Sequence, residues 1–440
     1  MRYEPAIETP SAPTPVEPAR RRGRRRRRKI VALVVTLALA ALSGGYAAYT
    51  LTAPIDAATL DATAPDVDTP AAAQIALPVE GAYAVSISGA DEYLGESASG
   101  IWASGGGDGP LPIASISKLI TALVVLDKKP LADTTDPGPT ITFSRADHAL
   151  YDKYYVLGAT IAEMPIGSSM SQRQALEAML IVSASNYAEA VSTWAFGSQG
   201  AFLQATRTWL AANGLTSTTI VEPTGIDARN VSTPADLIAL ARIAMANPVI
   251  TQIVGTTALN VPNIPSTLNT NTLLGVERIT GLKKGTLEGS GSNLLFTSTM
   301  DVGTAEPLSI IGVILGSFSR DSVNLDVRGL LGSIREGFHT VTLGVEGDAI
   351  GTYSTPWGES ADILLGETVS VLTWSDAAVT STFTASPLST GSDGDVVGSV
   401  TWTVGSETLT APLVLSGTIE PPDAWWRLTH PFELGAATAG

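Results

Sequence analysis

The chain has 440 residues, 44% of them hydrophobic, which is enough for more than one domain with a sizeable core. It has no cysteine and only three histidines, His148, His339 and His430, so disulfides, thiolate metal sites and cysteine nucleophiles are excluded. The scattered histidines also argue against a metal site, and we expect neither a metal nor another cofactor. The net charge is −16, and its uneven distribution gives the first indication of how the chain is organised.

The chain begins with a polar tail followed by an apolar stretch. Nine of the ten residues in 20–29 are basic, and residues 30–49 carry no charge. This stretch is just long enough to cross a bilayer core, and flanking basic residues stay on the cytoplasmic side. We therefore predict a disordered basic cytoplasmic tail over 1–29 and a single-pass transmembrane anchor over 30–52, with the remainder extracellular. A nucleic-acid-binding basic run and a cleaved signal sequence are the alternatives.

The part of the chain after this tail is strongly acidic. Without the first 29 residues it has 16 basic and 39 acidic residues, a net charge of −23. Such a charge argues against a nucleic-acid partner and is compatible with an extracellular surface. Residues 53–79 are rich in Pro, Ala and Thr and are predicted to form a linker.

Residues 80–340 have mixed helix and strand patterns. A strand is predicted from Gly81, and the run from Ser115 to Leu126 is apolar on nearly every side, which is typical of a buried helix. Further helices are predicted at about 171–182, 200–212, 232–247 and 323–338, with strands between 279 and 316. After residue 340, short β-like runs alternate with Gly, Ser and Asp turns, so 341–440 is predicted to be a small all-β domain.

Ser115 and Lys118 form a Ser-x-x-Lys sequence at the start of the predicted buried helix. Positions i and i+3 of a helix lie on one face, so the lysine amine can reach the serine hydroxyl. Burial disfavours the ammonium form and lowers the pKa of a lysine, which allows it to act as the base that a serine nucleophile requires. The alternative is a lysine that extends from a core helix to solvent.

A second basic cluster, Lys283-Lys284-Gly285-Thr286, lies in a predicted strand. Consecutive strand side chains face opposite ways, so one lysine can enter a cleft while its neighbour faces away. Gly285 would permit the close approach of a substrate backbone. Two solvated lysines on an edge strand are the alternative.

Together these residues resemble the penicillin-binding proteins and serine β-lactamases, and more narrowly the low-molecular-mass D-alanyl-D-alanine carboxypeptidases. The similarity covers about residues 80–340. It rests on five segments in order, PIASISKLITAL, MLIVSASNYAEAV, EPTGIDARNVSTPADLIALAR, GLKKGTLEGSGSNLLFTS and VILGSFSRD. The resemblance implies an α/β (α+β) fold: an antiparallel sheet flanked by helices plus a helical subdomain, as in the β-lactamase/transpeptidase-like superfamily. In such enzymes a small all-β domain often follows.

The resemblance also implies roles for the site residues. Ser115 would attack the carbonyl of a D-Ala-D-Ala bond, with Lys118 as base. Ser183 would relay a proton to the leaving D-alanine. Backbone N–H groups of Ser115 and Thr286 would form the oxyanion hole, and Lys283 would help bind the substrate carboxylate. The expected partners are peptidoglycan stem peptides, β-lactam antibiotics as covalent inhibitors, and the membrane through the N-terminal helix.

The second motif departs from the family pattern. It is normally Ser-x-Asn, but this chain has Ser183-Ala184-Ser185, with Asn186 one position late. Either Ser185 or Asn186 is expected to replace the missing asparagine, and Asn186 is counted among the substrate-binding residues.

The third motif departs as well. It is normally Lys-Thr-Gly, and Lys284 stands in place of the threonine. The arginine that the family often places after the last sheet strand has no clear counterpart near Val323–Asn324. Lys284 is either a defect or a substitute carboxylate ligand.

The expected function is that of a serine-type D-alanyl-D-alanine carboxypeptidase, bound to the cell membrane, that removes the terminal D-Ala from stem peptides. The alternatives are a β-lactamase or D,D-endopeptidase on the same scaffold, or a catalytically degenerate cell-wall-binding protein.

Overall fold

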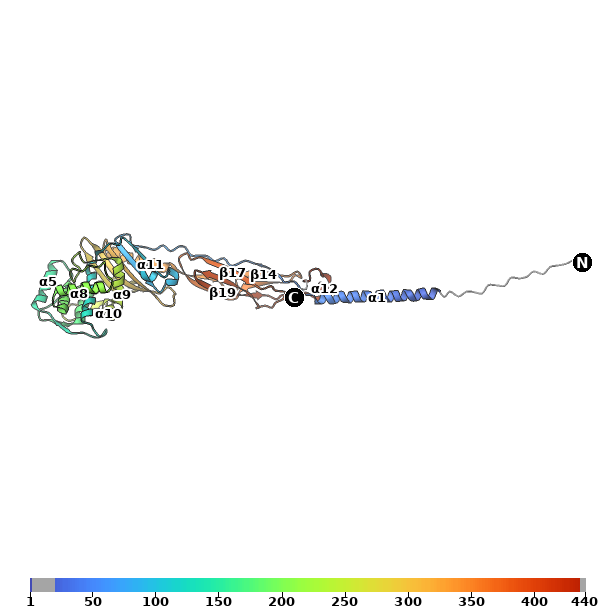
Figure 1. Ribbon diagram of the computed structural model, residues 1–440, viewed down its shortest axis with the longest axis horizontal. Helices are drawn as coiled ribbons and strands as arrows, with labels where there is room; N and C mark the ends of the chain where they lie inside the picture. Colours follow the sequence, from blue (N-terminus) through green and yellow to red (C-terminus); the bar gives the residue numbers. More distant parts are fainter. Residues whose placement is uncertain (2–19, 436–440) are drawn as a thin grey trace.

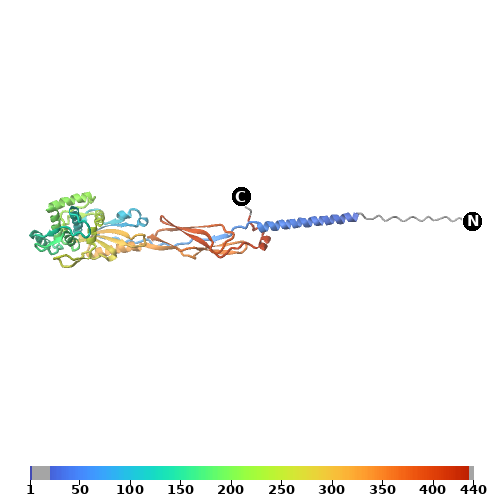
Figure 2. The ribbon, with the colours of Figure 1, turned by 90° about the horizontal axis from the view of Figure 1, so that it is seen from below.

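The computed structural model describes Met1 and residues 20–435, with side chains for Met1 and from residue 25 onward. The molecule is elongated: a long N-terminal helix, a β domain and a mixed helix-and-sheet domain follow one another along its axis (Figures 1 and 2). Most of the tail expected to be disordered, residues 2–19, lies outside the described residues. The part of it from Arg20 onward is helical, because arginine is a good helix former and the helix continues into the apolar stretch.

The long helix α1 spans Arg20–Thr52. It is long and apolar enough from Arg25 to Thr52 to cross a membrane, and an apolar stretch of 18 residues within it has no residue buried against the rest of the protein. The helix therefore projects away from the folded domains (Figure 1).

The segment expected to be a plain linker takes part in the β domain. Strand β1 (Thr59–Ala62) pairs in antiparallel register with β14 (Ala349–Ser354) at the edge of its sheet. An unpaired strand edge offers main-chain donors and acceptors, so a nearby extended segment can add to it. The segment therefore runs along the β domain before it reaches the distal domain (Figure 1).

The distal domain contains a five-stranded antiparallel sheet in the order β10-β11-β12-β2-β3. Its strands are β2 (Ala82–Ser88), β3 (Ala103–Gly105), β10 (Ile279–Leu287), β11 (Gly291–Met300) and β12 (Leu308–Ser317). Helix α11 (Arg320–Glu336) packs on β11 and β12, and its buried residues share one core with side chains of those strands. A second, larger core lies between the sheet and the remaining helices.

The helical subdomain surrounds the buried helix α4 (Ser117–Lys128), whose residues from Ser117 to Leu126 are all buried. Its other helices are α5 (Arg145–Val156), α6 (Gln172–Leu180), α7 (Ser185–Phe196), α8 (Gln199–Ala212), α9 (Pro234–Met245) and α10 (Pro248–Val254). Helix α6 begins with a capping box formed by Ser171 and Gln174, near the expected start at residue 171. The mixed fold of helices and antiparallel sheets expected from the resemblance is confirmed.

The β domain is a six-stranded sheet in the order β1-β14-β15-β19-β18-β17, accompanied by the pair β13-β16. Its core is centred on the fully buried Trp402. The added strands are β13 (Phe338–Gly344), β15 (Ser360–Leu365), β16 (Val369–Trp374), β17 (Val379–Ala385), β18 (Val396–Val404) and β19 (Glu407–Ser416). A last short helix, α12 (Ala424–Thr429), contacts α1.

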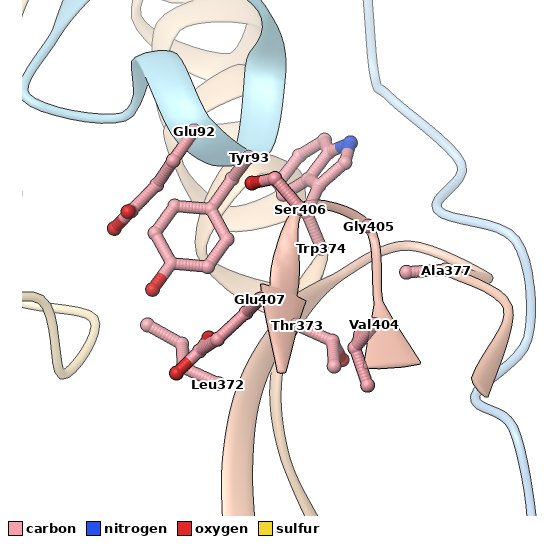
Figure 3. A pocket seen from close by; sticks show the side chains of 10 residues that line it. All are labelled: Glu92, Tyr93, Leu372, Thr373, Trp374, Ala377, Val404, Gly405, Ser406 and Glu407. Atoms are coloured by element: carbon pink, nitrogen blue, oxygen red, sulfur yellow. The ribbon is translucent and has the colours of Figure 1, made fainter. Parts of the chain in front are cut away.

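Aromatic side chains join the two domains. The Trp374 ring, at the end of β16, makes edge contacts with Trp102 and Phe338, at centroid distances of 5.9 and 4.8 Å. Beside them is a pocket of about 120 Å³, to which the distal domain contributes Glu92 and Tyr93 (Figure 3). Burial and the nearby Glu92 raise the pKa of the Tyr93 hydroxyl to about 12. This pocket is part of the domain junction and does not contain the Ser-x-x-Lys residues.

Candidate active site

Ser115 lies in a short 3₁₀ turn (Ala114–Ile116) immediately before α4, so the α-helix starts at Ser117, two residues later than expected. Its neighbours Ala114 and Ile116 are buried, whereas Ser115 itself is partly exposed. Ala114 has a φ of +47°, a left-handed backbone that is costly for a residue with a Cβ. The chain therefore makes a tight, strained turn that presents the serine at a surface.

Lys118 lies within hydrogen-bonding distance of this serine. Its Nζ donates to Ser115 Oγ at 3.1 Å and to the Thr224 carbonyl oxygen at 2.7 Å. The side chain is only 1% exposed, so the alternative of a lysine that reaches solvent is wrong. Burial lowers the pKa of the Lys118 amine to about 7, against a smaller opposing effect of the Glu222 carboxylate. Near neutral pH the amine can thus accept a proton.

The loop that contains Thr224 is held by Glu222, a residue that the sequence did not single out. The Glu222 carboxylate accepts hydrogen bonds from the backbone N–H groups of Thr224 and Gly225, at 2.7 and 2.5 Å. Asn230 Nδ2 donates to the Glu222 carbonyl oxygen at 2.8 Å and to Ser117 Oγ at 3.0 Å. These bonds connect the loop to the first residue of α4 and fix the carbonyl that accepts from Lys118.

Lys283 on β10 is 1% exposed and lies beside the second motif. Its Nζ donates to Ser183 Oγ at 3.0 Å. Burial, and then the positive charges of Lys118 and Lys284, lower the pKa of Lys283 well below its usual value. The alternative of two solvated lysines is therefore wrong for Lys283. The neighbouring Lys284 is only half-buried, as expected if consecutive strand side chains face opposite ways.

Gly285 lies against the nucleophile's own backbone. A Cβ at this position would come within 2.5 Å of the Ser115 N atom and 2.9 Å of the Ala114 Cβ. The expectation that Gly285 makes room for a substrate stays a prediction, and the structure adds a second reason for a glycine here. Only a residue without a side chain allows β10 to pack this closely on the turn before α4.

Arg320 supplies a positive charge beyond the last strand of the sheet. It is the first residue of α11, and its Nε donates to Thr286 Oγ1 at 3.2 Å. Burial, followed by the charge of Arg320, lowers the pKa of Lys284. The family arginine was expected near Val323–Asn324, a few residues after Arg320. The feature of the sequence that could have located Arg320 is the preceding Ser319, a residue type that favours helix starts. Its side chain caps α11 in the structure.

Asn186 is not positioned to bind a substrate, so this expectation is wrong. It is fully buried, its Oδ1 accepts from the Ala162 N–H at 3.1 Å, and its Nδ2 donates to the Ala162 carbonyl oxygen at 2.8 Å. Helix α7 begins at Ser185, and this start turns Asn186 toward the segment around Ala162. Ser185 remains at the position of the motif asparagine.

Comparison with known proteins decides the family. A family model described as D-alanyl-D-alanine carboxypeptidase matches residues 92–319, more than half of the chain. The chain belongs to the D-alanyl-D-alanine carboxypeptidase family. The resemblance seen in the sequence is thereby confirmed.

Curated relatives and solved structures agree with this membership. A D-alanyl-D-alanine endopeptidase of Pseudomonas aeruginosa is 33% identical over 142 residues, which is 32% of this chain and 42% of that protein. One of Haemophilus influenzae is 28% identical over 190 residues, which is 42% of this chain and 61% of that protein. The chain thus spans less than two thirds of the length of these relatives.

Among solved structures, penicillin binding protein 6B from Escherichia coli matches 81% of this chain and 100% of its own, with a TM-score of 0.52 and 19% identity. A D-alanyl-D-alanine carboxypeptidase from Francisella tularensis matches 82% and 98%, with a TM-score of 0.52 and 17% identity. At these identities the likeness supports the fold.

Proposed function

We propose that this family member is a serine-type D-alanyl-D-alanine carboxypeptidase that removes the terminal D-Ala from peptidoglycan stem peptides. The observation that carries the proposal is the hydrogen bond of 3.1 Å between the Lys118 amine and the Ser115 hydroxyl. A serine beside a lysine whose pKa is lowered to about 7 has the base that an acyl-transfer nucleophile needs.

In the first step, Ser115 Oγ attacks the carbonyl carbon of the D-Ala-D-Ala peptide bond and its proton passes to the neutral Lys118 amine. The new Oγ–C bond forms a tetrahedral intermediate with a negatively charged oxygen. Backbone N–H groups of Ser115 and Thr286 are the proposed donors to that oxygen. The tight packing of Gly285 on Ser115 supports this role, because it brings the two backbone segments together.

In the second step, the C–N bond breaks and the leaving amine of D-alanine takes up the proton that Lys118 had accepted. Ser183 is the proposed relay for this proton, since its hydroxyl already accepts a hydrogen bond from Lys283. Water then attacks the acyl-enzyme and gives a proton to the neutral Lys118 amine; the Oγ–C bond breaks, Lys118 returns the proton to Ser115 Oγ, and the shortened peptide is released. The enzyme returns to its starting protonation state.

Positive charge beside the nucleophile favours a substrate with a free C-terminal carboxylate. Lys284 and Arg320 are close enough for the arginine to lower the lysine pKa, and Arg320 also contacts Thr286. Two cations at this position can bind a carboxylate through charge-assisted hydrogen bonds. This supports a carboxypeptidase, whose substrate ends in such a carboxylate; the curated relatives above are endopeptidases by name, and the substrate assays below separate the two activities.

We place the enzyme at the cell membrane, with α1 as a single-pass anchor, its basic end cytoplasmic and the catalytic domain extracellular. The uncharged length of α1 and the basic residues at its start support this orientation. β-Lactams, which resemble the D-Ala-D-Ala bond, are the expected covalent inhibitors.

The direct test is mass spectrometry of the protein after incubation with a labelled penicillin. An adduct on Ser115 is expected, and replacing the base in Lys118→Met should slow its formation about 10²- to 10⁴-fold. Lys128→Met, which changes an exposed lysine at the far end of α4, serves as the control. No adduct on Ser115 would exclude every acyl-enzyme mechanism and favour a cell-wall-binding protein.

Substrate assays then separate the enzymatic candidates. Release of free D-alanine from a pentapeptide supports the carboxypeptidase. Cleavage of cross-linked dimers without D-alanine release supports the endopeptidase, and rapid hydrolysis of the penicillin supports a β-lactamase.

A further inference from the structure

The C-terminal end of the described chain meets the outer end of α1, near Thr52. The Tyr46 hydroxyl donates to the Leu428 carbonyl oxygen at 2.7 Å, and Arg427 Nη1 donates to the Ala53 carbonyl oxygen at 2.8 Å. Just beyond, Ile55 and Leu434 form a β-bridge. Thr50 is consequently fully buried, whereas the other residues of α1 from Arg25 to Thr52 are exposed or partly exposed. Helix α12 and the residues after it therefore hold the end of α1 (Figures 1 and 2).

The position of this contact along α1 corresponds to the edge of a bilayer. The uncharged stretch starts at Ile30, after Lys29. With a rise of about 1.5 Å per residue, a hydrocarbon core of roughly 30 Å extends from there to about Tyr49. Tyr46 and Tyr49 then lie at the outer boundary, and α12, bonded to Tyr46, lies at the same height.

Large aromatic side chains at this height are left exposed. Trp425 on α12 is 73% exposed and Phe432 is 99% exposed. Tyr46 and Tyr49 are also exposed, on α1 itself. Single exposed apolar residues are ordinary on protein surfaces, but aromatic residues gathered at the end of a transmembrane helix are typical of the membrane–water interface. The rings of Trp and Tyr suit that zone because one part is apolar and another can be hydrated.

We infer that α12 and the segment up to Leu434 form an interfacial collar that inserts Trp425 and Phe432 into the outer surface of the lipid bilayer. The inference rests on the proposed membrane anchoring by α1. The occupant of the exposed surface is lipid, because the collar is continuous with the helix that the lipid would surround. Within the collar, Arg427 Nη1 donates to the Ala53 carbonyl oxygen just past the end of α1. The last carbonyl groups of a helix have no partner inside the helix, so this bond satisfies one acceptor there.

The test uses the full-length protein reconstituted in vesicles of phosphatidylcholine and phosphatidylglycerol. The chain has no cysteine, so single cysteines can be introduced and labelled without background. The variants Trp425→Cys and Phe432→Cys alter exposed side chains and carry a small environment-sensitive fluorophore. Leu37→Cys, in the middle of α1, reports on the anchor, and Val396→Cys, exposed in the β domain, is the aqueous control.

Quenching by iodide in the water and by spin-labelled lipid in the bilayer is then compared. Probes at 425 and 432 should be quenched by the lipid and several-fold less by iodide than the probe at 396. If they behave like the probe at 396 while the probe at 37 lies in lipid, the collar is overturned and the anchor stands. If the probe at 37 is also accessible to iodide, both the anchor and the collar are overturned. Probes shielded from both quenchers would show that another protein surface covers the patch, which also contradicts the inference.

Discussion

Lys283 and Ser183 are 100 positions apart in the sequence, and a hydrogen bond of 3.0 Å joins their side chains. The bond connects β10 of the sheet to the turn before α7 of the helical subdomain. Lys118 also lies near enough for its positive charge to lower the pKa of Lys283, because two buried positive charges repel each other at low effective dielectric. Burial separately lowers the pKa of Lys118 to about 7, and this burial is what allows Lys118 to act as a base.

The pH dependence of acylation follows from this arrangement. Lys118 accepts the Ser115 proton only as a neutral amine, and its pKa is lowered to about 7. The acylation rate constant should therefore rise about tenfold per pH unit below pH 7 and level off above it. In Glu222→Gln the midpoint should move to lower pH, because the carboxylate raises the Lys118 pKa. Stopped-flow acylation by a chromogenic β-lactam measures both profiles, and a midpoint near the usual lysine pKa would contradict the assignment.

Lys284 should contribute to binding of the substrate carboxylate. Lys284→Thr removes one charge-assisted hydrogen bond, and kcat/KM for a peptide ending in D-Ala-D-Ala should fall about tenfold. Activity toward the same peptide with an amidated C-terminus should not change. Lys128→Thr is the matched control, since that lysine is exposed on α4. Higher activity in Lys284→Thr would instead identify the lysine as a defect relative to the family threonine.

Gly285 should be intolerant of any side chain. In Gly285→Ala the new Cβ would lie 2.5 Å from the Ser115 N atom, so the strand or the nucleophile turn must move. A displacement of about 1 Å in a reacting group typically costs about 10² in rate, and acylation should slow by that order. Gly332→Ala is the comparison, because nothing lies within 4 Å of a Cβ there. Equal acylation rates in the two variants would rule out the close packing.

Asn186 should matter for stability and not for substrate binding. Asn186→Ala leaves the buried N–H and carbonyl of Ala162 without their partner, which should lower the free energy of unfolding by about 1–3 kcal/mol. KM should stay unchanged. Ser185→Ala gives the contrast, because Ser185 occupies the motif position and its loss should alter the kinetics. Denaturant unfolding and peptidase assays separate the two effects, and a raised KM in Asn186→Ala with normal stability would reverse the assignment.

The sequence was informative wherever the chemistry is local. Ser115 and Lys118 are three residues apart, and the apolar residues after them indicated the burial that lowers the lysine pKa. Alternation along β10 likewise predicted that one of Lys283 and Lys284 enters a cleft while the other faces away. These features depend on helix and strand periodicity, which is visible in a short window.

The sequence was less informative where contacts are distant or where one residue decides an orientation. Thr224 accepts a hydrogen bond from Lys118 across 106 positions, and Arg320 reaches Thr286 across 34. No local pattern predicts such pairs. The orientation of Asn186 depends on the residue at which α7 begins, and helix boundaries are the least certain feature of a sequence.

The segment from residue 53 to 79 has a consequence for where the enzyme can work. It is fastened along its course, through β1 on β14 and through the bonds of the Ala73 and Ala76 N–H groups to Ser375 and Ser333, each 3.0 Å. Even fully extended, its 27 residues span no more than about 97 Å. With α1 in a bilayer, the β domain would hold the catalytic domain at a fixed height above the membrane, unlike a flexible linker. The catalytic serine would then trim only those peptides that occupy one layer of the wall above the membrane.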